Sequence, residues 1–449
     1  MAMGSTQPGP GPADRVRDLA DRAGSHVQRG ELNAARALYQ QMLDIVPTHP
    51  EALNFIALAA LQSGDTRRAV TLLERGAEAN PTDANLHKNL GLAYRAAGSA
   101  AAALNAFRCA TALKPDFAVA LLNQGALLIE LGRRDEAYGV YLDALDAAER
   151  TGLFLKDLAV IPTGVRVLAE KAVAVLQQAR AEVFQAALAP VEAGYGRPAL
   201  VRVRQCLDAY LGRHSESPLP LLQRPTFMTF PGLDNRPWYE RADFPWLASI
   251  EERTPAIRAE LLKVLESDVG FRPFVEMSTD HPRAAYWRQV NRSSSWNAYF
   301  FYRDGKRYEE NCARCPETAA ALDALPLDRV ADHSPEALYS VLKPGAQIPP
   351  HTGVINCRLV VHLPLIVPPD CGIRVGQETR GWQEGRCIVF DDTFEHEAWN
   401  KSPHTRVVVI FDIWNPQLTE AEREGMRTAI EALGSFNRMH GGEAGLHQS

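Results

Sequence analysis

Two histidines and one arginine in the last quarter of the sequence each lie beside a run of strand-like residues. His351 lies in the turn PHTG just before such a run, His396 lies in FDDTFEHEAWN just after one, and Arg406 opens the run RVVVIFDIW. Imidazoles are common ligands of transition metals, and a buried guanidinium pairs bidentately with a carboxylate. These residue types together favour a metal site that also holds an anionic cosubstrate.

The strand-like segment CRLVVHL adds a third histidine. Arg358, Val360 and His362 have the same parity in this segment, so they face one side of a strand, and the aliphatic residues between them face the other. This pattern predicts a polar pocket backed by an apolar core. A lone histidine is usually a satisfied structural residue, but three histidines with Arg406 favour a shared site.

Short β-strands must bring these residues together. Beyond residue 270, runs rich in Val, Ile and aromatics alternate with turn material, which predicts an antiparallel sandwich or barrel. His351 and His396 are 45 residues apart, so they meet only if the sheet folds back on itself, as in a jelly roll. The expected strands are YWRQV, WNAYFFY, ALYSVL, CRLVVHLPLIV, CGIRV, RCIVF and RVVVIFDIW, with turns at KPGAQIPPHTG, ETRGWQEG and NKSPHT.

The N-terminal part repeats with a period of 34 residues. Glycines, alanines and large apolar residues each recur at this spacing, and the pattern fits a helix–turn–helix unit with left-handed backbone at the glycines. It resembles the tetratricopeptide repeat, with four units, which form concave surfaces for peptides or proteins. A spacer or dimerisation element without a ligand is the alternative. The recurring residues are Gly30, Gly64, Gly98 and Gly132; Ala35, Ala69, Ala103 and Ala137; Tyr39, Leu73, Phe107 and Tyr141; Ala57, Gly91 and Gly125; and Pro47, Pro81 and Pro115.

The whole chain is therefore expected to be a multidomain α + β protein, with a helical repeat solenoid followed by a jelly-roll domain. Helices are also expected over Leu247–Leu265 and Thr419–Leu433, on either side of the strands. The expected segments are a flexible tail at 1–13, repeats at 14–149, a helical connector or cap at 150–214, the β-rich domain at 215–435 and a second flexible tail at 436–449.

Composition narrows the class of protein. Hydrophobic residues make up 46% of the 449 residues and charged residues 23%, which is ordinary for a soluble globular protein. A net charge of −6 gives no basic excess for nucleic acid, and no apolar run is long enough to span a membrane. The N-terminus lacks the features of a secretory signal, and seven scattered cysteines favour a reducing, cytoplasmic compartment.

Residues 340–416 carry long motifs that resemble a known family. SVLKPGAQIPPHTGVINCRLVVHLPLIV, FDDTFEHEAWN and FDIWNP are similar to segments of the aspartyl/asparaginyl β-hydroxylases. The likeness extends through FPGLDNRPWY and WNAYFFYRDGKR to cover residues 226–435. Members of this family are Fe(II)- and 2-oxoglutarate-dependent dioxygenases with a double-stranded β-helix fold, and animal members carry tetratricopeptide-like helices before the oxygenase.

The resemblance implies that His351 and His396 are the iron ligands. Most non-haem iron oxygenases add a carboxylate ligand, but this family lacks it, and Gly353 stands where it would be in an HxD motif. Asp392, four residues before His396, either orients a water in the vacant position or is a turn or capping aspartate. The resemblance thus implies catalytic roles for the two histidines and leaves two interpretations of Asp392.

The resemblance also implies how the cosubstrate and substrate are held. Arg406 and Ser340 would bind the distal carboxylate of 2-oxoglutarate, and His362 would contact its metal-bound end. Trp296 would line the cosubstrate pocket, and Arg358 would bind the substrate.

Two features depart from the animal relatives. A second substrate-binding arginine of those relatives is replaced by Val360, which removes a cationic group and puts aspartate as a substrate in question. Cys312 and Cys315 form a tight C-x-x-C, which is a zinc half-site, a redox pair or two ordinary thiols. The tryptophans expected to serve in packing are Trp382, Trp399 and Trp414.

The sequence therefore predicts a hydroxylase that uses Fe(II), 2-oxoglutarate and O2 and releases succinate and CO2. The predicted substrate is a peptide or protein side chain, of the aspartate or asparagine type, held by the repeats. The same chemistry on a free amino acid, a lipid acyl chain or a biosynthetic peptide is one alternative. A catalytically inactive interaction module is another, and the oligomeric state stays open.

Overall fold

The structure is a computed structural model that describes residues 11–152, 161–214, 218–278 and 283–442. The chain divides into two compact units, Met1–Leu176 and Gln177–Ser449. Within the described ranges, no helix combines the length and the apolar composition that crossing a membrane requires.

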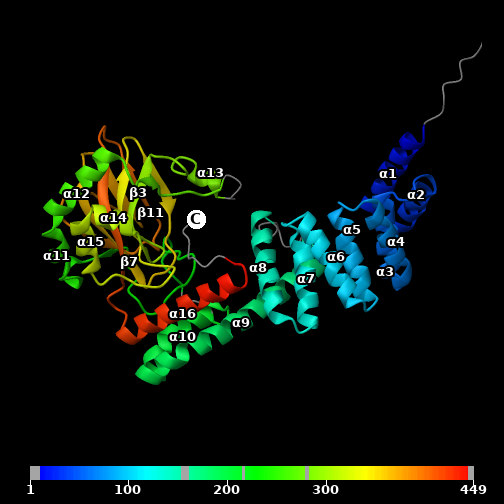
Figure 1. Cartoon of the computed structure of the whole chain (residues 1–449), viewed down its shortest axis with the longest axis horizontal. Coiled ribbons are helices and arrows are strands. Elements are labelled where there is room, and N and C mark those ends of the chain that lie inside the picture. The colour runs from blue at the N-terminus through cyan, green and yellow to red at the C-terminus, as the bar shows by residue number, and fades with distance from the viewer. Residues whose placement is uncertain (1–10, 153–160, 215–217, 279–282, 443–449) are drawn as a thin grey trace, which may run out of the picture. The chain divides into compact units, whose positions relative to one another are not determined.

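The four predicted repeats are present as four helix pairs (Figure 1). The glycine in each turn has a positive φ, between 74° and 81°, as expected of left-handed backbone. A Cβ at Gly91 would lie 2.6 Å from the ring of Phe107, and one at Gly125 would lie 2.4 Å from the ring of Tyr141. The small residues therefore permit a close approach of the paired helices. The helices are α1 (Pro12–Gln28), α2 (Leu32–Ile45), α3 (Pro50–Gln62), α4 (Thr66–Ala79), α5 (Ala84–Ala96), α6 (Ala100–Leu113), α7 (Ala118–Glu130) and α8 (Arg134–Arg150).

The border between the units falls inside the long helix α9 (Thr163–Tyr195), within the connector predicted at 150–214. After the short 3-10 helix η1 (Arg197–Leu200) comes α10 (Val201–Tyr210), and the final helix of the described chain is α16 (Glu420–Met439). Side chains of α9, α10 and α16 share one apolar cluster of the second unit. The connector residues after 176 thus belong to the core of that unit.

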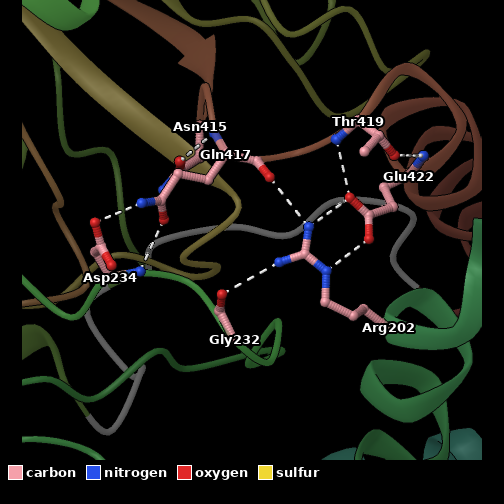
Figure 2. Close-up of polar contacts among 7 residues, drawn as sticks. All are labelled: Arg202, Gly232, Asp234, Asn415, Gln417, Thr419 and Glu422. Atoms are coloured by element: carbon pink, nitrogen blue, oxygen red, sulfur yellow. Dashed lines mark hydrogen bonds and ion pairs between the residues drawn. The ribbon is translucent and has the colours of Figure 1, made fainter.

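A polar network fastens α10 to α16 (Figure 2). Arg202 donates hydrogen bonds to both carboxylate oxygens of Glu422, each at 2.6 Å, and to the carbonyl oxygens of Gly232 and Gln417. Glu422 in turn forms a capping box with Thr419, which fixes the start of α16. One arginine therefore ties the connector helix, the loop before the strands and the last helix together.

The second unit is built on two antiparallel β-sheets. The order in the larger sheet is β1-β10-β7-β12-β5-β3-β2, with β4 paired to β3, and the order in the smaller sheet is β6-β11-β8-β9. From β5 to β12 the chain passes back and forth between the sheets, which is jelly-roll connectivity. The predicted combination of a helical repeat region with an antiparallel β-domain is confirmed.

The strands and the remaining helices of the second unit have the following bounds. The larger sheet contains β1 (Trp238–Tyr239), β2 (Arg272–Pro273), β3 (Trp296–Arg303), β4 (Lys306–Arg307), β5 (Ala337–Leu342), β7 (Arg358–Ile366), β10 (Ile388–Phe390) and β12 (Arg406–Trp414). The smaller sheet contains β6 (Gln347–His351), β8 (Cys371–Val375), β9 (Glu378–Arg380) and β11 (His396–Asn400). The remaining helices are η2 (Arg241–Asp243), α11 (Leu247–Glu251), α12 (Thr254–Ser267), α13 (Ala284–Trp287), α14 (Glu309–Arg314) and α15 (Pro316–Asp323).

The outer face of the larger sheet packs against α11, α12 and α15 (Figure 1). Leu359, Val361 and Leu363 of β7 are fully buried in this core, as are Val407 and Val409 of β12. The residues between them face the other way, toward the smaller sheet. The alternation predicted for CRLVVHL therefore positions its polar residues inside the sandwich.

Several predicted elements were wrong. YWRQV is not a strand, because it holds the end of the short helix α13. The predicted turn KPGAQIPPHTG contains strand β6, whose two prolines are tolerated because β6 is an edge strand. The predicted turn ETRGWQEG contains strand β9, and the segment HEAWN, not predicted as a strand, is β11.

The predicted helix ends also shifted. The single helix expected over Leu247–Leu265 is two helices, because Pro255 begins a new helix in the first turn of α12. The last helix continues beyond Leu433, and α1 begins at Pro12, so both enter the segments predicted as tails. Residues 1–10 and 443–449 of those predicted tails lie outside the described residues.

Candidate active site

A cavity of about 240 Å³ lies between the two sheets. Its walls include every residue that the sequence assigned to the metal, the cosubstrate or the substrate, contributed by six different strands or the loops between them. These residues are Trp296, Ser340, His351, Arg358, His362, Asp392, His396 and Arg406.

The two candidate metal ligands meet across the smaller sheet. His351 ends β6, His396 begins β11, and the two residues are directly paired in the antiparallel register. Their ring centroids are 4.0 Å apart. The Nδ1 atom of His351 lies 2.8 Å from the carbonyl oxygen of Pro349, and that of His396 lies 2.9 Å from the carbonyl oxygen of Phe394. Because a carbonyl only accepts, each Nδ1 carries the proton and each Nε2 keeps its lone pair for a metal.

Both rings are held in the neutral form that binds metals. Burial lowers the pKa of His396 to about 4. Burial, and then the nearby His396, lower the pKa of His351 well below its ordinary value. Nothing else in the described chain adds a third ligand, because no group of three His, Cys, Asp or Glu side chains there is arranged to hold a metal.

Arg406 is a buried cation that lacks a counter-ion. It is 1% exposed, and its Nη1 donates only to the backbone oxygen and hydroxyl of Ser340, at 3.4 and 3.3 Å. Its Nε has no partner, and no carboxylate pairs with it anywhere in the described chain. Burial lowers its pKa to about 10. Since an unpaired buried charge is costly, this guanidinium is suited to an anionic ligand.

Two tryptophans orient the groups around Arg406. The indole of Trp382 lies 4.9 Å from the guanidinium and donates a hydrogen bond of 3.3 Å to Nδ1 of His362. That bond puts the proton of His362 on Nε2, which makes the ring a donor to a ligand. Trp296 donates to the hydroxyl of Ser340 at 3.1 Å. Trp382, predicted to serve in packing, does pack against the apolar cluster beside the cavity, and it makes these polar contacts as well.

The structure separates the two adjacent aspartates. Asp391 stabilises the turn, because its Oδ1 accepts from both the backbone and the hydroxyl of Thr393. The carboxylate of Asp392 instead lines the cavity, where it lies against Gly353. Of the two interpretations left open by the sequence, the turn-capping one therefore describes Asp391.

Arg358 is paired with acidic residues inside the cavity. Its guanidinium lies 3.6 Å from Asp392 and 3.4 Å from Asp412. Glu336 donates its backbone N–H to the carboxylate of Asp412 at 3.0 Å. Val360, which replaces a second arginine, lies directly opposite Asp412 in the sheet register. The predicted substrate-binding arginine is thus already neutralised by its surroundings.

Sequence reasoning missed two acidic residues of this cavity, Glu336 and Asp412. Asp412 has the same parity as Arg406 in RVVVIFDIW, so the alternation rule could have assigned both residues to the cavity face. Glu336 carried no comparable signal, because it precedes the first residue of β5.

Cys312 and Cys315 lie in the core behind the larger sheet, outside the cavity. Both are free thiols, and burial raises the pKa of each to about 11. A thiol that stays protonated is neither a good nucleophile nor a metal ligand. Of the three interpretations, two ordinary thiols fits best.

Comparison with known proteins divides the chain in the same way. Residues 251–416 match the family model of the aspartyl/asparaginyl beta-hydroxylases, and residues 26–90 match that of the tetratricopeptide repeat. A crystal structure of MamA is 25% identical, with a TM-score of 0.29, and the match covers 30% of this chain and 80% of that chain.

Two curated relatives match the β-rich part. The ornithine lipid ester-linked acyl 2-hydroxylase of Rhizobium tropici is 39% identical over 187 residues, which cover 41% of this chain and 62% of that protein. The human aspartyl/asparaginyl beta-hydroxylase is 32% identical over 200 residues, which cover 43% of this chain and 25% of that protein. The match therefore spans less than two thirds of either relative. The resemblance stated from the motifs is thus confirmed, because residues 251–416 match the aspartyl/asparaginyl beta-hydroxylase family model and follow a match to the tetratricopeptide repeat.

Proposed function

We propose that this protein is an Fe(II)- and 2-oxoglutarate-dependent dioxygenase that hydroxylates a carbon atom. The observation that carries the proposal is the buried, uncompensated guanidinium of Arg406 in the same cavity as two imidazoles with available Nε2 atoms. A cavity that holds both a cation and a metal site suits a ligand that chelates the metal at one end and carries a carboxylate for the cation at the other. The match of this domain to a hydroxylase family model supports the same chemistry.

The residues present fit the proposed groups. His351 and His396 would hold Fe(II) through Nε2, and Arg406 with Ser340 would hold the distal carboxylate of 2-oxoglutarate. His362 would donate from Nε2 to the other end of the cosubstrate. Bound iron would supply the activation of O2 that converts 2-oxoglutarate to succinate and CO2 and puts one oxygen atom into a C–H bond.

The chain itself binds and orients these groups. Trp296 and Trp382 fix the hydroxyl of Ser340 and the ring of His362 before the cosubstrate arrives, which reduces the cost of ordering them. Ile373 and Phe390 add apolar surface to the cavity wall, and Phe390 packs against the rings of His362 and His396. Asp392 is the acidic side chain beside Gly353, and we assign to it the positioning of a water near the metal.

The repeats support a peptide or protein substrate. Tetratricopeptide stacks offer surfaces that bind peptides, and the human relative is named for aspartyl and asparaginyl hydroxylation. We therefore propose side-chain hydroxylation of a peptide or protein, with the repeats as the recruiting surface. The free thiols of all seven cysteines support a reducing, cytoplasmic location.

Hydroxylation of a lipid acyl chain is the second candidate. It is favoured by the Rhizobium tropici relative, which is named as an acyl hydroxylase and is 39% identical. The two candidates share the iron and cosubstrate sites and differ only in the acceptor.

Succinate formation from 2-oxoglutarate tests the proposal. The full chain with Fe(II) and O2 should form succinate and CO2, and His351→Ala should abolish this with the fold intact. A search for products heavier by one oxygen among peptides and lipids should then identify the acceptor. Absence of Fe(II)-dependent succinate formation in the wild type, with every candidate acceptor added, would favour the catalytically inactive interaction module.

A further inference from the structure

The two ends of strand β12 give the cavity opposite charges. Arg406 and Asp412 face the same interior, and six residues of extended strand separate them by about 20 Å. Between them lie apolar residues and His362, which pairs with Ile410 in the register. The cationic end suits the cosubstrate, so the opposite end is available to the substrate.

The opposite end is strongly acidic. Four carboxylates surround the single guanidinium of Arg358, and two of them, Asp392 and Asp412, lie within 4 Å of it. Asp328, which is 2% exposed, lies behind this group and has a buried Oδ1 without a partner among the described residues. The surrounding carboxylates are Asp328, Glu336, Asp392 and Asp412, and we call them with Arg358 the acidic end.

Glu336 is the member of the acidic end whose carboxylate has no partner among the described residues. Its side chain lines the cavity, and in the described chain its carboxylate makes no hydrogen bond and no ion pair. The nearest alternative cation, Arg303, is itself 3.9 Å from Glu276 and 4.0 Å from Asp304. Glu336 therefore presents to the cavity a half-buried carboxylate without a protein partner among the described residues.

The electrostatics agree with this geometry. Burial, and then Asp412, raise the pKa of Glu336 to about 7, in spite of the opposing effect of Arg358 and Arg303. Burial likewise raises the pKa of Asp412 and Asp328. A bound cation would relieve this repulsion, whereas a bound carboxylate would increase it.

We propose that the acidic end, through Glu336 and Asp412, binds a cationic group of the substrate, an alkylammonium or a guanidinium. This inference rests on the proposed function, because it assigns the acceptor of that same cavity. The acceptor carries its positive group at the far end of the cavity from Arg406, and the carbon to be hydroxylated lies between them. An aspartate side chain is a poor acceptor here, since Val360 supplies no cation and Arg358 is already paired.

Calorimetric titration of the full chain, without added metal, tests the charge preference. The probes are Nα-acetyl-lysine methylamide, the uncharged norleucine derivative and the aspartate derivative. The lysine derivative should bind most tightly, and Glu336→Gln should weaken it by about tenfold or more, since a charge-assisted contact is lost. Glu378→Gln, at an exposed position on β9, is the matched control and should leave the affinity unchanged.

Two outcomes would overturn the inference. One is equal affinity for the lysine and norleucine derivatives, and the other is an unchanged affinity in Glu336→Gln. Pentylammonium, which has the charged chain but no peptide groups, shows which part of the lysine derivative is recognised. Equal affinity for the two probes would mean that the acidic end recognises the charged chain alone. A lower affinity for pentylammonium would mean that the peptide groups are recognised too. Cation binding that depends on Glu336, without succinate formation, would instead refute the proposed function and leave this site standing.

Discussion

The carboxylate of Asp392 occupies the space that a side chain at Gly353 would fill. A Cβ built on Gly353 lies 2.2 Å from the carboxyl carbon of Asp392, far inside van der Waals contact. Glycine at this position is therefore required by its neighbour across the cavity wall. The acidic side chain four positions before His396 thus lies where a side chain two positions after His351 would stand.

Gly353→Ala should therefore lower the stability of the protein. Truncating Asp392 in the same chain should recover the stability that Gly353→Ala loses. The added methyl group must displace a buried carboxylate, which costs about 1–3 kcal/mol. In the double variant Gly353→Ala/Asp392→Ala the clashing atoms are gone, so the two effects should be strongly non-additive. Thermal unfolding of the wild type, the two single variants and the double variant measures this non-additivity. Strictly additive losses of stability would show that the two residues do not compete for one space.

Arg406→Ala should weaken binding of 2-oxoglutarate about 30-fold to a few thousand-fold, because a desolvated carboxylate loses its partner at about 2–5 kcal/mol. The melting temperature should not fall, since this guanidinium has no counter-ion among the described residues to lose. Anaerobic calorimetry of the metal-loaded proteins measures the affinity, with the exposed Arg314→Ala as the control. Equal affinity in Arg406→Ala and wild type would remove Arg406 from the cosubstrate site.

Glu336→Gln should stabilise the protein at pH 8 and do so much less at pH 5. Burial, and then the nearby Asp412, raise the pKa of Glu336 to about 7 in the folded protein, against the opposing effect of Arg358. An unfolded glutamate titrates near pH 4.3. Between these values the folded state holds a proton that the unfolded state has released. The stability of the folded protein therefore falls as the pH rises from about 4.3 to about 7. Above pH 7 the full cost of ionising Glu336 in the folded state is present.

Scanning calorimetry of the wild type, Glu336→Gln and the control Glu378→Gln at both pH values measures the effect. The expected gain for Glu336→Gln at pH 8 is a few degrees in Tm. A variant that is less stable than the wild type at pH 8 would mean that the carboxylate is already satisfied.

A chain that begins at residue 177 should fold and bind 2-oxoglutarate, whereas one that begins at residue 215 should not fold stably. The shorter chain lacks α10, so Met426 and Leu433 of α16 lose apolar partners, and Glu422 loses Arg202. Solubility, thermal unfolding and calorimetry of the two chains provide the comparison. Equal stability of both would show that the connector helices are dispensable for the β-domain.

The sequence predicted the site better than the strands that hold it. Helical repeats and strands such as RVVVIFDIW have strong periodicity, so they were recognised. The strands that carry His351 and His396 were missed, because one contains Pro349 and Pro350 and the other, HEAWN, lacks the apolar alternation of a strand. Only their pairing in the sheet, which depends on the fold of the whole domain, makes them strands.

Of the acidic end of the cavity, only Arg358 and Asp392 were singled out from the sequence. Glu336, Asp392 and Asp412 are far apart in the chain, and each alone is an ordinary acidic residue. Their effect arises from sharing one buried volume with Arg358, which spacing does not reveal. The contacts of Trp382 with His362 and Arg406 were not predicted either, since its segment was predicted as a turn.

The central claim is that His351 and His396 share one metal ion in the cavity that contains Arg406. The most direct test is anomalous diffraction from crystals of the full chain soaked anaerobically with Mn(II) and 2-oxoglutarate, with His351→Ala crystals treated in the same way. We expect one metal peak within bonding distance of both Nε2 atoms, with 2-oxoglutarate lying between the metal and the guanidinium of Arg406. The variant should show no such peak. A wild-type crystal with no metal between the two histidines, or with 2-oxoglutarate bound away from Arg406, would contradict this claim.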